Sequence, residues 1–380
     1  MDALFITFIF MFKNKIYINY FFEIFKTFLT IILGLSLIAF TVRAVNFLEL
    51  IVDNGYSLNT YFKYSIFNIF GIAPKFFPLA FLVSISIFLF KHNNNSEFVI
   101  LWTTGVKKIV IVNLLLVSSF IIIILYLIFS VYLTPLALNK SREMISDSEF
   151  NSFLPTIRSQ NFSDSFKNLT FLVEKKIDNE LKNIFLHDTG KNLKNFPSSS
   201  TDISSTTIIA EKGVVEKKYL FLINGEIITN KKNNEKTEIV KFDQLDINLE
   251  NLRTNVITSP KLQETSTLKL LSCFNKNNTN YKVCNSDAKG EIIPVLVRRL
   301  ILPAYIPVLA LICSFLLINK NSSLKNRFNI FFCSFILLVL VELILKYTGT
   351  NSLIRTIYVI MPAIILSMLY PLLIYKFSKY

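Results

Sequence analysis

Residues 91–108 have the sequence KHNNNSEFVILWTTGVKK and separate two long apolar runs. Serine commonly caps helix N-termini, so Ser96 predicts a helix that begins at Glu97. Gly105 stands where a C-terminal cap belongs, and the two lysines after it suit the negative end of a helix dipole. We therefore predict a helix of about two turns within residues 95–106, beside a membrane.

Three apolar side chains of this helix are expected to lie on one face. Phe98, Leu101 and Trp102 follow i, i+3, i+4 spacing, which places them in one stripe. A helix at a membrane surface does not need an aromatic stripe facing water, so the stripe is expected to contact another protein. The alternative is that Trp102 contacts only the membrane.

The composition indicates an integral membrane protein. Hydrophobic residues make up 52% and aromatic residues 14% of the 380 positions, more than an ordinary soluble domain carries. Several uncharged runs reach the roughly 20 residues that cross a bilayer. The net charge of +14 comes without any nucleic-acid-binding signature, so it does not indicate a nucleic-acid partner.

Six apolar segments are expected to span the membrane, three on each side of a polar insert. They are 21–45, 61–90 (interrupted by two prolines), 109–133, 300–318, 328–345 and 357–375. The predicted domains are an N-terminal membrane region at 1–135, an insert at 136–290 and a C-terminal membrane region at 291–380. Residues 1–12 lack the features of a signal peptide and are expected to form an extension or an interfacial segment, with Met11 as an alternative start.

The distribution of cations predicts the orientation. Ten lysines and arginines lie in the termini and loops on one side, and two lie in the short loops on the other. The positive-inside rule then puts both termini and residues 91–108 in the cytoplasm and the insert outside.

The insert is expected to be a β-sandwich or jelly roll. Its candidate strands are 170–174, 183–187, 206–211, 219–228, 237–242 and 245–249. Turns are expected at Asn224-Gly225 and at 230–235, a loop at 190–205, and an irregular link at 261–289. Cys273 and Cys284 are either disulfide-bonded, if the insert lies outside the cytoplasm, or free.

Sequence signatures of catalysis are missing. The chain has no P-loop motif, no H-E-x-x-H and no G-x-S-x-G, and its two histidines, His92 and His187, disfavour a metal site. We therefore predict no catalytic residues, no metal and no cofactor. Charged residues do occur in or near the apolar segments, where they normally face a cavity or a partner; they are Arg43, Lys75, Glu342 and Lys346.

The domain order and two short motifs resemble the LptF/LptG family of permeases. The motifs are F-P-L-A, with Pro78, late in the second span and N-S-E-x-x-x-L-x-x-x-G, with Glu97, after it. The resemblance covers nearly the whole chain from Met11 and is strongest between Pro74 and Gly105; strand features of the insert lean towards LptF. It implies a transmembrane subunit of the ABC transporter that exports lipopolysaccharide across the inner membrane of Gram-negative bacteria.

The resemblance also implies partners and site residues. The partners are a paralogous permease subunit, an LptB ATPase dimer that uses the ATP and Mg²⁺, the periplasmic proteins LptC and LptA, and lipopolysaccharide. The helix at Glu97 would couple to the ATPase; the alternative is that Glu97 only complements its helix N-terminus.

Arg43 matches family cations that meet lipid A phosphates, or else it is an interfacial arginine. Lys75 departs from the carboxylate often found there, and either adds a cation to the cavity or pairs with Glu342. Glu342 equally suits Lys346 at i, i+4. Arg298 and Arg299 match the family's arginine at the junction between the insert and the membrane region. They are expected either to contact substrate, the lipid surface or Glu291, or to stabilise the junction itself.

Two other classes of protein remain as alternatives. A mechanotransmission permease of the FtsX/MacB kind has four membrane helices, against six here. A membrane assembly protein without an ATPase would not need an amphipathic cytoplasmic helix.

Overall fold

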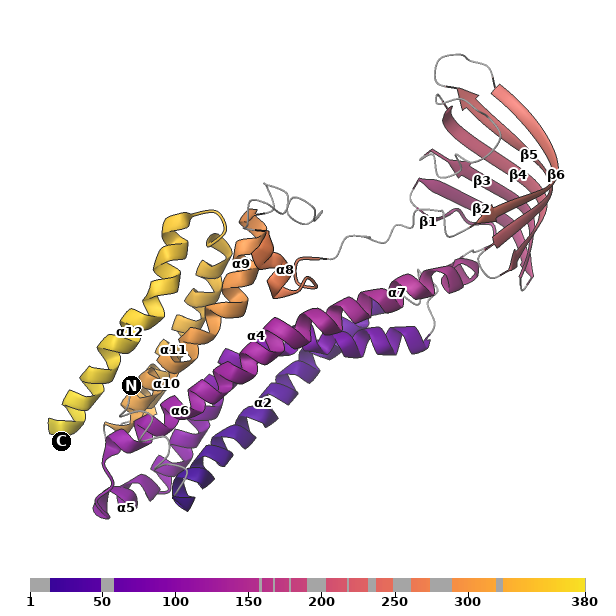
Figure 1. The fold of residues 1–380 in the computed structure, drawn as a ribbon. Coiled ribbons are helices and arrows are strands. Elements are labelled where there is room, and N and C mark those ends of the chain that lie inside the picture. Colours follow the sequence, from indigo (N-terminus) through magenta and orange to yellow (C-terminus); the bar gives the residue numbers. More distant parts are fainter. Residues whose placement is uncertain are drawn as a thin grey trace. The chain divides into compact units, whose positions relative to one another are not determined.

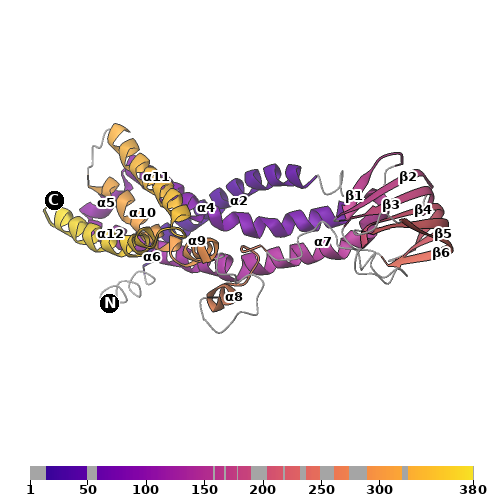
Figure 2. The ribbon, with the colours of Figure 1, turned by 90° about the horizontal axis from the view of Figure 1, so that it is seen from above.

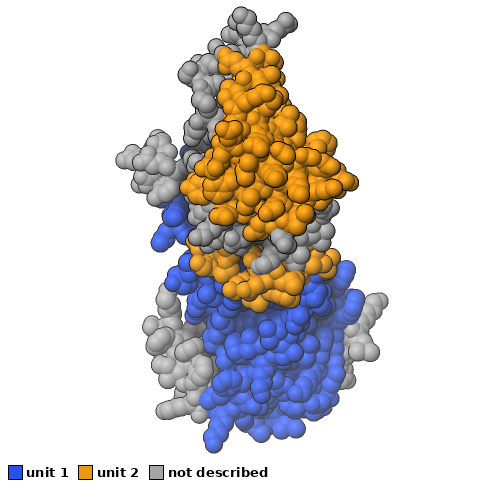
Figure 3. Space-filling model, turned by 90° about the vertical axis from the view of Figure 1, so that its right-hand side faces the viewer, with its two compact units in different colours: residues 1–41, 67–139, 259–380 blue, residues 42–66, 140–258 orange. Residues whose placement is uncertain are grey.

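The computed structural model describes most of the chain. The described residues are 14–48, 58–156, 159–166, 168–177, 179–189, 203–216, 219–231, 237–248, 261–273, 289–318 and 324–379, so the predicted N-terminal extension lies outside them. The chain forms two compact units, which Figure 3 colours separately. Unit 1 comprises residues 1–41, 67–139 and 259–380, and unit 2 comprises residues 42–66 and 140–258.

The first three predicted spans lie in long helices (Figure 1). They are α2 (Lys15–Phe47), α4 (Leu58–Asn94) and α6 (Lys108–Leu127). The third continues through a π-helical turn, η1 (Ile128–Leu133), into the polar helix α7 (Thr134–Thr156). The helix therefore extends well beyond the predicted end of the span.

Helix α4 is continuous through two prolines, where the sequence predicted an interruption. Pro74 has no N–H, so the carbonyl of Phe70 one turn earlier loses its helical donor. The hydroxyl of Thr134 donates to this carbonyl at 2.7 Å. Backbone groups in a membrane need an internal partner, and this hydrogen bond allows the helix to continue.

The C-terminal spans include one bent segment. Helix α9 (Lys289–Leu300) is followed by the 3₁₀ turn η4 (Leu302–Tyr305), α10 (Ile306–Ser314) and the 3₁₀ turn η5 (Phe315–Leu317). Helices α11 (Leu324–Tyr347) and α12 (Ser352–Lys379) complete the chain. Among the described residues, five helices are long and apolar enough to cross a membrane, and the spans number six if the bent pair, at 45°, is one span. Counted in this way, three spans precede the insert and three follow it, as predicted.

The core of unit 1 is built around α6 and α10. In α10 only Ile312 of the nine residues is not fully buried, and the core extends to α2 through Phe28 and to α4 through Phe81. By contrast, only 17% of the apolar membrane-spanning segment is buried within the chain in each of α2, α11 and α12. Their outward apolar surfaces suit contact with lipid or with another membrane helix.

The insert contains one antiparallel sheet whose six strands are adjacent in sequence order, as Figure 2 also shows. The strands are β1 (Ser163–Phe166), β2 (Leu169–Ile177), β3 (Glu180–Asp188), β4 (Ile203–Glu216), β5 (Tyr219–Lys231) and β6 (Thr237–Asn248). Alternating residues such as Val173, Ile184, Ile208 and Leu222 form a separate apolar core on one face. The predicted fold class, an α-helical membrane protein with a β insert, is confirmed.

Several details of the insert differ from the sequence prediction. The two strands predicted at 237–242 and 245–249 are one strand, β6, and β1 was missed. Asn224 and Gly225 lie inside β5, where Asn224 has a φ of 54° and the pairing register is unchanged on either side. The link after the sheet contains a short helix, α8 (Thr267–Ser272).

Candidate functional site

The short helix α5 (Glu97–Thr103) lies where the sequence predicts it. Gly105 has a φ of 92°, the left-handed conformation that a residue just past a helix end requires. The prediction that Ser96 caps the helix is wrong, because its side chain makes no capping hydrogen bond. Only Asn95 and Ser96 separate α4 from α5, and this tight turn puts Ser96 at φ 58°, outside the extended region of a capping residue.

The apolar face of α5 packs against the chain's own helices. Phe98 is fully buried, with its ring 6.0 Å from that of Phe88 and 6.4 Å from that of Tyr20. It is a core residue, so the prediction that it contacts another protein is wrong. Trp102 stacks on Phe98, and the Lys108 ammonium lies 4.8 Å from its ring centre.

Leu101 is partly buried against the same core. The outward side of α5 instead presents Ile100, which is 61% exposed, and Glu97, whose side chain is 37% exposed. Periodicity identified the apolar face correctly, but it does not indicate whether the chain itself covers that face.

A cluster of charged side chains joins three helices beside Phe98. His92, at the end of α4, has Nδ1 at 2.5 Å from Glu97 Oε2 and Nε2 at 2.9 Å from Glu23 Oε2 on α2. Lys91 contacts the other oxygen of Glu23 at 2.6 Å. The imidazole is only 4% exposed and packs against the rings of Tyr20 and Phe88.

The electrostatics of Glu97 follow from these contacts. Burial raises the pKa of this carboxyl group, but hydrogen bonds from Asn95 and His92 lower it by more, so the net shift is downward. Asn95 donates from its side-chain nitrogen at 3.1 Å. The environment of Glu97 therefore favours the ionised carboxylate.

Two adjoining cavities in unit 1 bring together the predicted cations. One, of about 240 Å³, is lined by Lys75, Arg298 and Glu342 together with apolar residues of α4, α10 and α11. The other, of about 230 Å³, is lined by Lys75, Arg298, Arg299 and Lys346. The sequence prediction that these residues face a cavity agrees with this arrangement.

The pairing inside these cavities differs from the alternatives that sequence left open. Glu342 accepts a hydrogen bond from Arg298 at 2.8 Å, and its ion-pair partner is thus Arg298 rather than Lys346. Sequence reasoning missed this pair because 44 positions separate the two residues. Arg43 is exposed on α2 and belongs to unit 2.

Arg299 holds the link that returns from the insert. Its buried guanidinium donates to the carbonyls of Leu262, Gln263 and Thr265 and to the hydroxyl of Thr267. The arginine therefore has a structural role at this junction.

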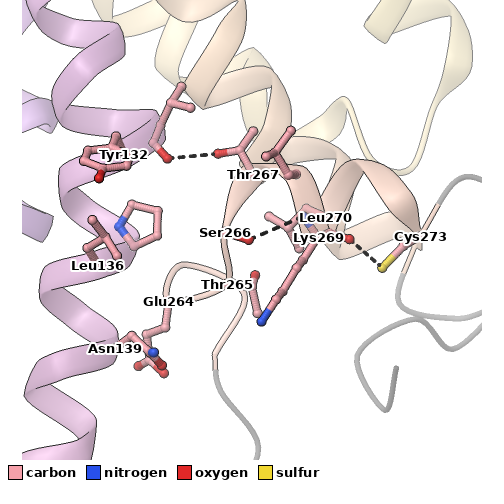
Figure 4. A pocket seen from close by; sticks show the side chains of 13 residues that line it. Tyr132, Leu136, Asn139, Glu264, Thr265, Ser266, Thr267, Lys269, Leu270 and Cys273 are labelled. Atoms are coloured by element: carbon pink, nitrogen blue, oxygen red, sulfur yellow. Dashed lines mark hydrogen bonds between the residues drawn. The ribbon is translucent and has the colours of Figure 1, made fainter. Parts of the chain in front are cut away.

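The helix that begins in this link, α8, lies beside the π-helical turn (Figure 4). The Thr267 hydroxyl donates to the carbonyl of Val131 at 3.4 Å. The two segments enclose a largely apolar pocket of about 540 Å³, with Tyr132 and Leu136 on one side and Leu270 on the other.

The cysteines divide into two groups. Cys273, at the end of α8, is disulfide-bonded, whereas Cys313 and Cys333 are free thiols. Cys284 lies outside the described residues, so the pairing of Cys273 with Cys284 stays a prediction. Within the described ranges, no group of three or more His, Cys, Asp or Glu side chains is placed to hold a metal ion.

Five long apolar helices in the described part of the chain, or six spans with the bent pair counted as one, and an antiparallel β insert define a polytopic membrane protein. The family model described as lipopolysaccharide export system permease LptF/LptG matches residues 19–376. The chain therefore belongs to the LptF/LptG family, and it is an integral membrane protein of permease type. No curated protein matches the chain.

Proposed function

We propose that this chain is one of two paralogous permease subunits that extract lipopolysaccharide from the outer leaflet of the inner membrane. An LptB dimer hydrolyses the ATP, and the lipid passes to LptC and LptA on its way to the outer membrane. The observation that carries this proposal is the family match over residues 19–376. The chain itself has no catalytic role in this scheme.

The cation-lined cavities support binding of a phosphorylated lipid. Arg298 offers a planar set of N–H donors that suits a phosphate, and Lys75 adds a second positive charge in both cavities. Glu342 forms an ion pair with Arg298, so a phosphate that reaches this guanidinium competes with the carboxylate. Arg43 is the second proposed contact, from its exposed position on α2.

Helix α5 supports coupling to an ATPase. Its outward surface carries the exposed Ile100 and the ionised, partly exposed Glu97, which suit a basic and partly apolar groove. The cation distribution supports a cytoplasmic location for this helix and a periplasmic location for the insert. In the periplasm, the apolar face of the sheet would shield acyl chains, since exposure to water costs about 0.8 kcal/mol per methylene.

The test is reconstitution of the chain with a paralogous permease and the ATPase in lipid vesicles. We expect lipopolysaccharide to stimulate ATP hydrolysis and to become crosslinked to residues around Arg298. For Arg43, the effect of Arg43→Ala and the effect of removing the lipid A phosphates should overlap; additive losses of crosslinking would argue against that contact. If ATP hydrolysis is the same with and without lipopolysaccharide and no lipopolysaccharide is crosslinked to the chain, the proposed function is refuted.

A further inference from the structure

The contacts of His92 specify its protonation state. Its two ring nitrogens face carboxylate oxygens of Glu97 and Glu23 at 2.5 and 2.9 Å. A neutral imidazole has one N–H donor and one lone pair, so it can donate to only one of the two. Only the imidazolium form donates to both carboxylates at once.

The surroundings of the ring fit a positive charge. Glu23 on α2 and Glu97 on α5 supply two negative charges, and the ammonium of Lys91 is shared with Glu23. Tyr20 on α2 is the other ionisable group against the ring, with the two ring centres 4.8 Å apart. Because the imidazole is 4% exposed, water cannot readily replace a lost carboxylate contact.

We propose that protonated His92 is a clasp that joins α5 to α2, and that it positions the coupling helix of the transporter. The coupling role of α5 rests on the proposed function, whereas the clasp between α5 and α2 does not depend on it. Helix α5 has only seven residues and follows α4 after a two-residue turn. The Glu97–His92–Glu23 bridge ties it by polar contacts to the N-terminal membrane helix, beside the ring contact between Phe98 and Tyr20.

Loss of the His92 side chain opens the clasp. Without the imidazole, neither of the two contacts to Glu97 and Glu23 remains. Helix α5 then keeps its chain connection to α4 and the ring contact of Phe98 with Tyr20 on α2, but it loses the polar bridge to α2. A push on α5 would therefore reach α2 fully only while His92 bridges the two carboxylates.

Hydrogen–deuterium exchange of the full chain in detergent micelles tests the clasp without any transport. We expect the protection of amides in α5 to be about tenfold lower in His92→Gln than in wild type, as loss of a hydrogen bond to a charged group would give.

The chain offers a matched control, because it has only one other histidine. His187 lies in β3 and contacts the hydroxyl of Thr207 at 2.9 Å. His187→Gln should leave the protection of α5 at the wild-type level. Nitrogen-15 spectra of the histidine-labelled chain, assigned with the two variants, should show both nitrogens of His92 protonated in the folded chain. A neutral ring, or α5 protection that is the same in His92→Gln as in wild type, would overturn the proposal.

The same variants then test the functional part in the assembled transporter. We expect lipopolysaccharide-stimulated ATP hydrolysis per unit of basal hydrolysis to be similar in wild type and in His187→Gln, and to be low in His92→Gln. If stimulation is absent in wild type, the proposed function fails while the exchange result stands. If stimulation is present and identical in His92→Gln, the positioning role is refuted.

Discussion

Removal of the Glu342 carboxylate should make the chain bind phosphorylated lipid more tightly. The carboxylate occupies Arg298 through a 2.8 Å ion pair whose side chains are 34% and 33% exposed. An ion pair with that much exposure is worth roughly 0.5–1 kcal/mol, which a phosphate must overcome to reach the guanidinium. Glu342→Gln removes this competition, so the dissociation constant for lipid A should fall about two- to fivefold.

The assay is titration of lipid A into the purified chain in nanodiscs, with dephosphorylated lipid A in parallel. The variant should change the affinity only for the phosphorylated lipid. Glu291→Gln is the matched control, because Glu291 is an exposed carboxylate on the same helix as Arg298. Weaker binding of lipid A by Glu342→Gln, or an equal change for both lipids, would refute the assignment of Arg298 to a phosphate.

Three further predictions concern α5 and α4. Glu97→Arg reverses the charge offered to the ATPase and repels His92, so lipid-stimulated hydrolysis should be lost while the complex still assembles; unchanged transport would exclude coupling through this residue. Because the pKa of Glu97 is lowered in the fold, its stabilising contacts are present above about pH 4.5 and are lost as the pH falls below it, so the protection of α5 amides, corrected for intrinsic exchange, should fall in acid. Thr134→Val should lower stability in thermal unfolding by about 1 kcal/mol, but much less in a Pro74→Ala background, where the Phe70 carbonyl regains its helical donor; additive effects would contradict that explanation.

The helical part of the fold was predictable because its signal is local. Membrane spans follow from apolar runs, and the end of α5 follows from Gly105 and the lysines after it. The predicted start of α5 at Glu97 was correct, but the predicted cap was wrong, because the capping preference of Ser96 gives way to the conformation that a two-residue turn imposes. Strand boundaries were less accurate, since a continuous strand such as β6 also contains polar residues that resemble a turn.

The site was only partly predictable because its contacts join distant positions. Glu97 could be singled out from its motif, but Glu23 lies 69 residues before His92, and no spacing rule connects them. The Arg298–Glu342 pair has the same character, since sequence reasoning left Lys75 and Lys346 as equal alternatives for the partner of Glu342. Patterns identify which side chains need a partner in the membrane, and the packing of the helices decides which partner each one gets.

The hydrogen bond from Thr134 to the carbonyl of Phe70 also restricts the order in which the two positions can have changed during evolution. A chain that gained Pro74 first would have carried a carbonyl without a donor between two membrane helices, at a cost of about 1–3 kcal/mol. A hydroxyl at position 134 is harmless when residue 74 still donates, because it can bond within its own helix. The permissive change is therefore the threonine, and reversal of the pair must begin at the proline.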